Sequence, residues 1–85
     1  MATLVEYMHW LRSIGGNCKS GIGADEKIGM VPVIRLVGPD GRALTHGGGN
    51  QYEVLSILTI RYFDRRLGVI SPFNVTPFKV VPKDE

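Results

Sequence analysis

The chain has 85 residues, of which 44% are hydrophobic and 21% are charged, a balance typical of one folded domain and not of a disordered chain. The formal net charge of +2 is too small to indicate nucleic-acid binding by itself, and the single cysteine excludes a disulfide framework and a cysteine-based zinc site. No apolar run approaches the roughly 18 residues of a transmembrane helix, and the N-terminus lacks a signal-peptide pattern, so we expect a cytoplasmic protein without a membrane partner.

An amphipathic helix is predicted over residues 4–14. Thr3 and Glu6 have the spacing of a capping box, in which the hydroxyl accepts a hydrogen bond from an early backbone N–H and the carboxylate reaches back to the cap. Apolar residues then recur with a helical period, at Leu4, Tyr7, Met8, Leu11 and Ile14. Gly15 and Gly16 end the helix, since glycine adopts the left-handed conformation of a helix C-terminus at little cost.

A β-hairpin is predicted after a glycine-rich connection. Residues 15–29 contain five glycines and indicate a long irregular segment, with a short strand or turn around Ile22 or Ile28. The run 31–37 is rich in β-branched residues and predicts a strand, and residues 38–41 have strong turn chemistry. Residues 42–46 can then return as the second strand.

A second helix is predicted over residues 51–67. Asn50 is a good N-cap, Glu53 follows at capping-box spacing, and Gly68 suits the C-terminus. The helix is apolar on two nearly opposite faces, one carrying Val54, Leu55, Leu58 and Tyr62 and the other Ile60, Phe63 and Leu67. A helix that is apolar on two sides is buried on two sides, and a second subunit is a natural supplier of the additional cover.

The segment from residue 69 to the C-terminus cannot be a helix, because prolines recur at positions 72, 77 and 82. We therefore divide the chain into a single domain over residues 1–71 and a C-terminal arm over residues 72–85, docked on the domain or on a neighbouring subunit. The predicted fold class is α+β, with two helices packed on a small, mainly antiparallel sheet in the order helix, hairpin, helix and extended tail. A strand from the tail is a further candidate for the sheet.

The first candidate site is an anion-binding helix N-terminus, where free backbone N–H groups and the helix dipole favour phosphate or carboxylate. Neither a Walker motif nor a dinucleotide fingerprint is present, so a flexible linker is the alternative interpretation. The candidate residues are His46, Gly47, Gly48, Gly49 and Asn50.

The second candidate site is a basic patch made of Arg35, Arg42, Arg61 and Arg65. It would contact nucleic acid or an acidic partner, whereas the simpler interpretation is a solvated helix end. Cys18 lies next to Lys19, which could lower the pKa of its thiol, but nothing in the sequence ties it to His9 or His46. We predict no catalytic residue, no metal site and no cofactor.

The function predicted from these features is a non-catalytic interaction protein that forms a homodimer or a higher homo-oligomer, with a separate protein partner as a further option. The interface candidates are Tyr62, Phe63, Leu67, Phe73 and Phe78. Two alternatives are kept. One is a nucleic-acid-binding regulator or RNase-like toxin that uses the basic patch and His46, and the other is a binder of small anionic ligands at residues 47–50.

Residues 4–67 resemble the HicA-type RNA-cleaving toxins in their order of helix, hairpin and helix and in placing His46, Gly47 and Gly48 shortly before the last helix. The resemblance implies RNA cleavage, but the family's Gly-Ser-His segment, which carries its catalytic histidine, is replaced here by residues 19–21, which contain no histidine. In size and organisation the chain also resembles small orphan proteins of mobile elements, integron gene cassettes among them. That resemblance implies a small oligomer with a binding surface.

Overall fold

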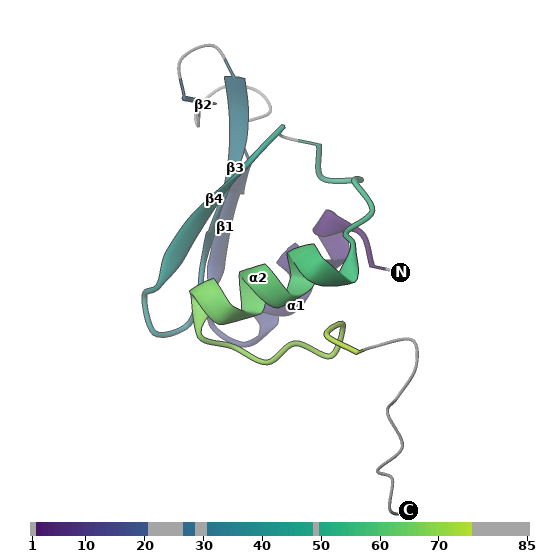
Figure 1. The fold of residues 1–85 in the computed structure, drawn as a ribbon. Helices are drawn as coiled ribbons and strands as arrows, with labels where there is room; N and C mark the ends of the chain where they lie inside the picture. Colours follow the sequence, from purple (N-terminus) through teal and green to yellow (C-terminus); the bar gives the residue numbers. More distant parts are fainter. Residues whose placement is uncertain (1, 21–26, 29–30, 49, 76–85) are drawn as a thin grey trace, which may run out of the picture.

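The α+β class and the order helix, hairpin, helix are confirmed by the computed structural model, which describes residues 2–20, 27–28, 31–48 and 50–75 (Figure 1). The elements in chain order are α1 (Leu4–Ser13), β1 (Asn17–Ser20), β2 (Lys27–Ile28), β3 (Val31–Val37), β4 (Ala43–Gly47) and α2 (Ile57–Leu67).

The sheet is built around β3, which pairs antiparallel with each of the other strands. Along most of its length β3 lies between β1 and β4, and the two residues of β2 pair with its first two residues. The predicted turn at residues 38–41 joins β3 to β4: Gly41 N–H donates to the Gly38 carbonyl, and Gly38 N–H donates to the Arg42 carbonyl. Gly38 also touches the end of α2, because a Cβ at this position would lie 2.6 Å from the Leu67 carbonyl oxygen.

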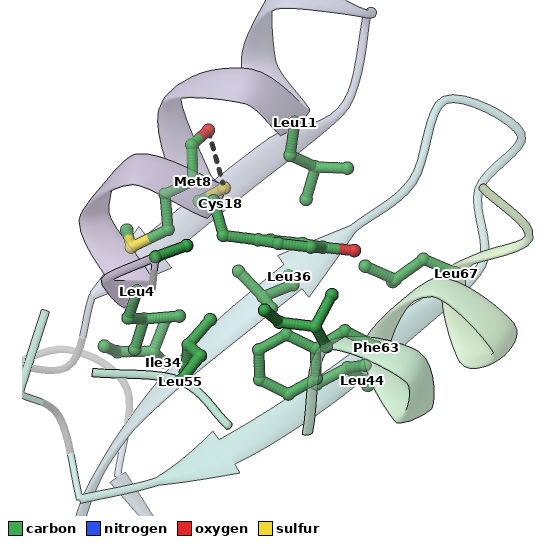
Figure 2. Close-up of a cluster of buried hydrophobic side chains, with 13 residues drawn as sticks. Leu4, Met8, Leu11, Cys18, Ile34, Leu36, Leu44, Leu55, Phe63 and Leu67 are labelled. Atoms are coloured by element: carbon green, nitrogen blue, oxygen red, sulfur yellow. Dashed lines mark hydrogen bonds between the residues drawn. The ribbon is translucent and has the colours of Figure 1, made fainter. Parts of the chain in front are cut away.

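Both helices lie on the same side of the sheet, so the domain has two layers (Figure 1). α1 packs against β1, and α2 packs against β4. The core fills the space between the layers with side chains from the helices, the strands and the segment before α2 (Figure 2). Its fully buried members include Leu4, Tyr7, Leu11, Ile34, Leu36, Leu55, Phe63 and Leu67.

Strand β1 lies inside the segment that the sequence predicts to be irregular. Its four residues have little β propensity, but the Cys18 side chain is buried in the core and the strand pairs with β3 over its whole length. Tertiary pairing therefore decides the conformation here. Ile28 belongs to β2, in agreement with the predicted short strand, whereas Ile22 lies outside the described residues.

The predicted start of the second helix is wrong. α2 begins at Ile57 after the N-cap Ser56, whose hydroxyl accepts a hydrogen bond from Thr59 N–H. The Asn50 side chain instead accepts a hydrogen bond from Tyr52 N–H, an arrangement typical of a local turn. The end of the helix is as predicted, because Gly68 adopts the left-handed conformation with a φ of 71°.

The residues before α2 are not helical because their backbone groups pair with the N-terminus of α1. Leu4 N–H donates to the Glu53 carbonyl at 2.8 Å, and Val5 N–H donates to the Gln51 carbonyl at 2.7 Å. The first N–H groups of a helix have no partner within the helix, so these carbonyls satisfy donors that would otherwise be buried unpaired. The predicted capping box of Thr3 and Glu6 is confirmed. In it the Thr3 hydroxyl accepts a hydrogen bond from Glu6 N–H, a further donor in the first turn of α1.

A buried carboxylate joins the two helices to the segment that follows them. Asp64 is 4% exposed and accepts hydrogen bonds from the Tyr7 hydroxyl at 2.7 Å, from the Ser71 hydroxyl at 3.0 Å and from Ser71 N–H at 2.9 Å. Buried carboxylates are tolerated when their oxygens are hydrogen-bonded, as they are here. Burial and then the hydrogen bond to Asp64 raise the pKa of the Tyr7 hydroxyl far above its ordinary value.

The first residues of the predicted arm pack on the domain itself. The Phe73 ring lies 6.0 Å from the Tyr7 ring and 6.4 Å from the Trp10 ring, measured between centroids. The rest of the arm, including Pro77, Phe78 and Pro82, lies outside the described residues. No helix in the described part of the chain is long and apolar enough to cross a membrane.

Substitution of Tyr7 by Phe tests the buried network. The variant Tyr7→Phe removes one donor to Asp64 and keeps the ring, so we expect the free energy of unfolding to fall by about 2 kcal/mol. Urea denaturation measures the change. The matched control is Tyr62→Phe, since Tyr62 is 44% exposed and its loss of the hydroxyl should cost less than about 0.5 kcal/mol.

The hydrogen bond between Tyr7 and Asp64 also predicts that the stability depends on pH. Because the pKa of Tyr7 is raised in the folded state above the unfolded value of 10.0, its stabilising contribution is complete below pH 10 and decreases as the pH rises above 10. The stability difference between the original protein and Tyr7→Phe should therefore shrink in this range. Equal losses in Tyr7→Phe and Tyr62→Phe would contradict the role given to the buried hydroxyl.

Candidate functional site

The glycine segment after β4 does not form a helix N-terminus. Gly47 is the last residue of β4, and Gly48 has a φ of 95° and donates its N–H to the Pro32 carbonyl at 3.1 Å. The geometric basis of the predicted anion site is therefore absent from the described residues, because α2 begins at Ile57. Gly49 lies outside the described residues.

His46 takes part in a small polar contact at the end of β4. Its Nε2 lies 3.0 Å from Glu53 Oε1, and its ring packs edge-on against Phe63 with 5.2 Å between centroids. The side chain is about one-fifth exposed. The pair connects β4 to the segment whose carbonyls satisfy the start of α1, so its observed contacts are structural.

The four arginines of the predicted basic patch do not share one surface. Arg35 projects from β3 on the face opposite the helices, since its neighbours in the strand, Ile34 and Leu36, fill the core. Arg61 and Arg65 are exposed on α2, which packs on the other face. Arg42 lies at the turn between β3 and β4, where its Nε is 3.3 Å from Asp40 Oδ2.

Arg35 does have a basic neighbour on its own face. Lys19 of β1 lies opposite Arg35 in the register of the two strands, and Thr45 lies opposite Arg35 on β4. All three side chains are exposed. The sequence did not indicate this pair, because it depends on β1, which was not predicted.

The interface candidates separate into buried and exposed residues. Phe63 and Leu67 are 1% and 0% exposed inside the core of their own chain, so neither can meet a partner unless the core opens. Tyr62 is half-exposed, with the Arg66 guanidinium 5.8 Å from its ring centroid. Phe73 is half-buried against Tyr7 and Trp10. Phe78 lies outside the described residues.

Cys18 has the environment of a structural cysteine. Its side chain is buried, and its Sγ lies 3.7 Å from the Met8 carbonyl oxygen (Figure 2). Its own carbonyl accepts a hydrogen bond from Arg12. Burial raises the pKa of the thiol, although the nearby Arg12 opposes this effect. A nucleophilic cysteine needs a lowered pKa, so the environment disfavours thiolate chemistry.

An apolar groove lies among the described residues, and the sequence did not indicate it. Its volume is about 480 Å³, which falls within the range of ligand and peptide pockets. Four separate parts of the chain meet there: the N-terminus with α1, the segment before α2, the first turn of α2, and residues 72–75. The lining residues are Ala2, Glu6, Leu55, Ile57, Ile60, Pro72, Phe73 and Val75.

The floor and the rim of the groove differ in chemistry. Ala2, Leu55 and Ile60 are buried and form an apolar floor, whereas Val75 is 65% exposed at the rim. Glu6 is the single charged lining residue, and its Oε1 already accepts a hydrogen bond from Thr3 N–H. The groove can therefore hold apolar groups and place one negative charge beside them.

Iodoacetamide labelling tests the environment of Cys18. We expect the folded protein to be alkylated at least roughly tenfold more slowly than the urea-unfolded protein, because the thiol is buried and its pKa is raised. Mass spectrometry follows the reaction. The matched control is the double variant Cys18→Ala with Lys19→Cys, whose thiol is exposed and should react at nearly the unfolded rate; rapid labelling of folded Cys18 would contradict the assignment.

Comparison with protein-family models, with curated proteins and with solved structures finds no match to this chain. Within the described residues, no group of three or more histidine, cysteine, aspartate or glutamate side chains could hold a metal ion. The geometry of the chain itself is therefore the basis for a functional proposal.

Proposed function

We propose that this chain is a non-catalytic interaction protein that works as a homo-oligomer and holds an apolar segment of a partner protein in the groove. The groove carries the proposal, since seven of its eight lining residues have apolar side chains. Binding sites for protein segments combine such an apolar floor with a few polar groups that fix orientation. A cytoplasmic setting belongs to the proposal, because the single cysteine is a buried thiol.

The partner segment is defined by the charge of the groove as well as its apolar floor. Glu6 is exposed, and one carboxylate oxygen caps α1 through Thr3. A basic side chain flanked by aliphatic residues would complement this arrangement, because the ammonium group can approach the carboxylate while the aliphatic groups cover the floor. A segment with an acidic residue at the same place would meet a like charge.

The homo-oligomer is supported by apolar side chains that the single chain leaves in contact with water. Leu58 on α2 is 71% exposed and Ile70 is 89% exposed. Single exposed aliphatic residues are ordinary, but cover by a second copy of the chain would remove both of these side chains from water. The mobile-element resemblance is consistent with this proposal and has no structural counterpart here.

Peptide binding tests the groove. We expect an acetylated peptide of four leucines around one lysine to shift the NMR signals of Ile57, Ile60 and Phe73, and the same peptide with glutamate in place of lysine to bind more weakly. Val75→Asp should weaken binding of the lysine peptide about tenfold, since it places a carboxylate at the apolar rim.

The matched control for the groove variant is Ile70→Asp, which introduces the same charge at an exposed aliphatic position outside the lining residues. It should leave the affinity within about twofold of the original. Equal effects of Val75→Asp and Ile70→Asp, or shifts confined to residues outside the groove, would argue against this site.

A nucleic-acid-binding regulator is the second candidate, favoured by one observation. Lys19 and Arg35 lie opposite each other on neighbouring strands, on the sheet face away from the helices. Two adjacent cations on a sheet can contact consecutive phosphates. The RNase-like alternative has less support, because His46 contacts Glu53 and Phe63 on the other face.

Single-stranded RNA binding tests this second candidate. A fluorescent oligouridine should bind at about 50 mM salt and lose affinity steeply as salt rises, and Lys19→Glu should abolish binding. The control is Arg61→Glu on the helical face, which should have a smaller effect. Absence of RNA binding at low salt would contradict the nucleic-acid-binding function.

A further inference from the structure

The hydrogen-bond alternation of the hairpin shows which groups of β4 face outward. At one end of the pair Gly38 N–H donates to the Arg42 carbonyl, and at the other end Gly48 N–H donates to the Pro32 carbonyl. Hydrogen-bonded pairs alternate along an antiparallel ladder. The residue pairs bonded between these ends are therefore Leu36 with Leu44 and Ile34 with His46.

It follows that the N–H and carbonyl groups of Ala43, Thr45 and Gly47 point away from β3, along the outer edge of the sheet. No hydrogen bond from these groups to another element is found among the described residues. β4 also contains no proline and no lysine, which are the usual means of protecting an edge strand. We call this row of three residues the β4 edge.

On the opposite side of the sheet, the outward backbone groups of Cys18 in β1 bind the chain's own side chains. The same alternation places the N–H and carbonyl of Cys18 on the outer side of β1. Asn17 Oδ1 accepts from Cys18 N–H at 2.9 Å, and Arg12 Nη2 donates to the Cys18 carbonyl at 3.3 Å. The next residue along the strand is the exposed Lys19. Among the described residues, the outward groups of Cys18 on β1 therefore have partners, whereas those of the β4 edge have none.

We infer that the β4 edge pairs antiparallel with the β4 edge of a second copy of the chain, which joins the two sheets into one. This inference rests on the homo-oligomer of the proposed function and gives it a backbone contact, separate from the exposed Leu58 and Ile70. The occupant is a second copy because the edge is self-complementary: a two-fold axis at Thr45 places Thr45 opposite Thr45 and Ala43 opposite Gly47. Each outward-facing residue then exchanges both backbone groups, and cross-strand threonine pairs are favourable.

The small and uncharged residues at this edge allow close approach of the two copies. Ala43, Thr45 and Gly47 lie on the same face of β4, and none of them carries a large side chain that would obstruct pairing. On the inner face α2 covers β4, and the half-exposed Tyr62 lies next to Phe63, whose ring contacts His46 of β4. An antiparallel pairing keeps both α2 helices on the same side of the joined sheet.

The decisive experiment combines solution mass with hydrogen exchange. Light scattering after size exclusion should show a dimer that dissociates on dilution. At dimer concentrations the amides of Thr45 and Gly47 should be protected from exchange, and on dilution they should exchange at least about tenfold faster. The Leu44 amide, which is bonded to β3 in the monomer and the dimer, is the internal control.

Substitutions at Thr45 provide the second measurement. Thr45→Pro removes the outward N–H, which has no partner among the described residues, and should raise the dimer dissociation constant at least about tenfold. Thr45→Val keeps the N–H and the branched shape and should preserve the dimer. Thr45→Lys, which places two like charges at the axis, should also weaken the dimer and serves if the proline variant does not fold.

The outcomes separate this inference from the proposed function. A dimer whose Thr45 amide exchanges equally fast at all concentrations, or which Thr45→Pro and Thr45→Lys leave intact, would overturn pairing through the β4 edge while the homo-oligomer stands. A monomer at every concentration would overturn both. Peptide binding in the groove should be unchanged by Thr45→Lys, because Thr45 lies on the sheet face away from the helices.

Discussion

The buried carboxylate of Asp64 is the interaction on which the arrangement of the helical layer depends. It receives donors from α1 through Tyr7 and from the segment after α2 through Ser71, so three parts of the chain meet at one side chain. A carboxylate away from water is costly unless its oxygens are satisfied, and this requirement restricts where Tyr7 and Ser71 can lie. Because Ser71 is held in this way, Pro72 and Phe73 follow in a defined position and form one wall of the groove.

The parts of the fold that were predictable are those specified by local chemistry. The capping box of Thr3 and Glu6, the turn at residues 38–41 and the left-handed Gly68 each act within a few residues of the chain, and the structure contains all three. The start of α2 was not predictable in this way. Asn50 and Glu53 have the spacing of a cap, but the carbonyls of Gln51 and Glu53 have partners on α1, far away in sequence.

For the candidate site, too, the sequence could predict only features that depend on residues close together in the chain. Periodicity predicted a second apolar face of Val54, Leu55, Leu58 and Tyr62, and this prediction is wrong in part. Val54 and Leu55 precede α2, and Leu55 is buried in the core, while Leu58 and Tyr62 on the helix face water. The groove has no linear signature, because its lining comes from four separate segments and exists only when these pack together. The paired Lys19 and Arg35 were hidden because their proximity depends on the register of an unexpected strand.

The two edges of the sheet differ in how many of their backbone groups have partners among the described residues, and this difference affects the size of any assembly. An unprotected edge that pairs with any other edge can propagate without limit, and this is why natural sheets protect their edges. Here a two-fold pairing through β4 would use the β4 edge of both copies, and β1 would lie on the far side of β3 in each copy. In each of these, Asn17 and Arg12 occupy the outward backbone groups of Cys18. Asn17 and Arg12 would therefore oppose further pairing at β1, and a small domain with a limited core would gain buried surface from the two-fold pairing.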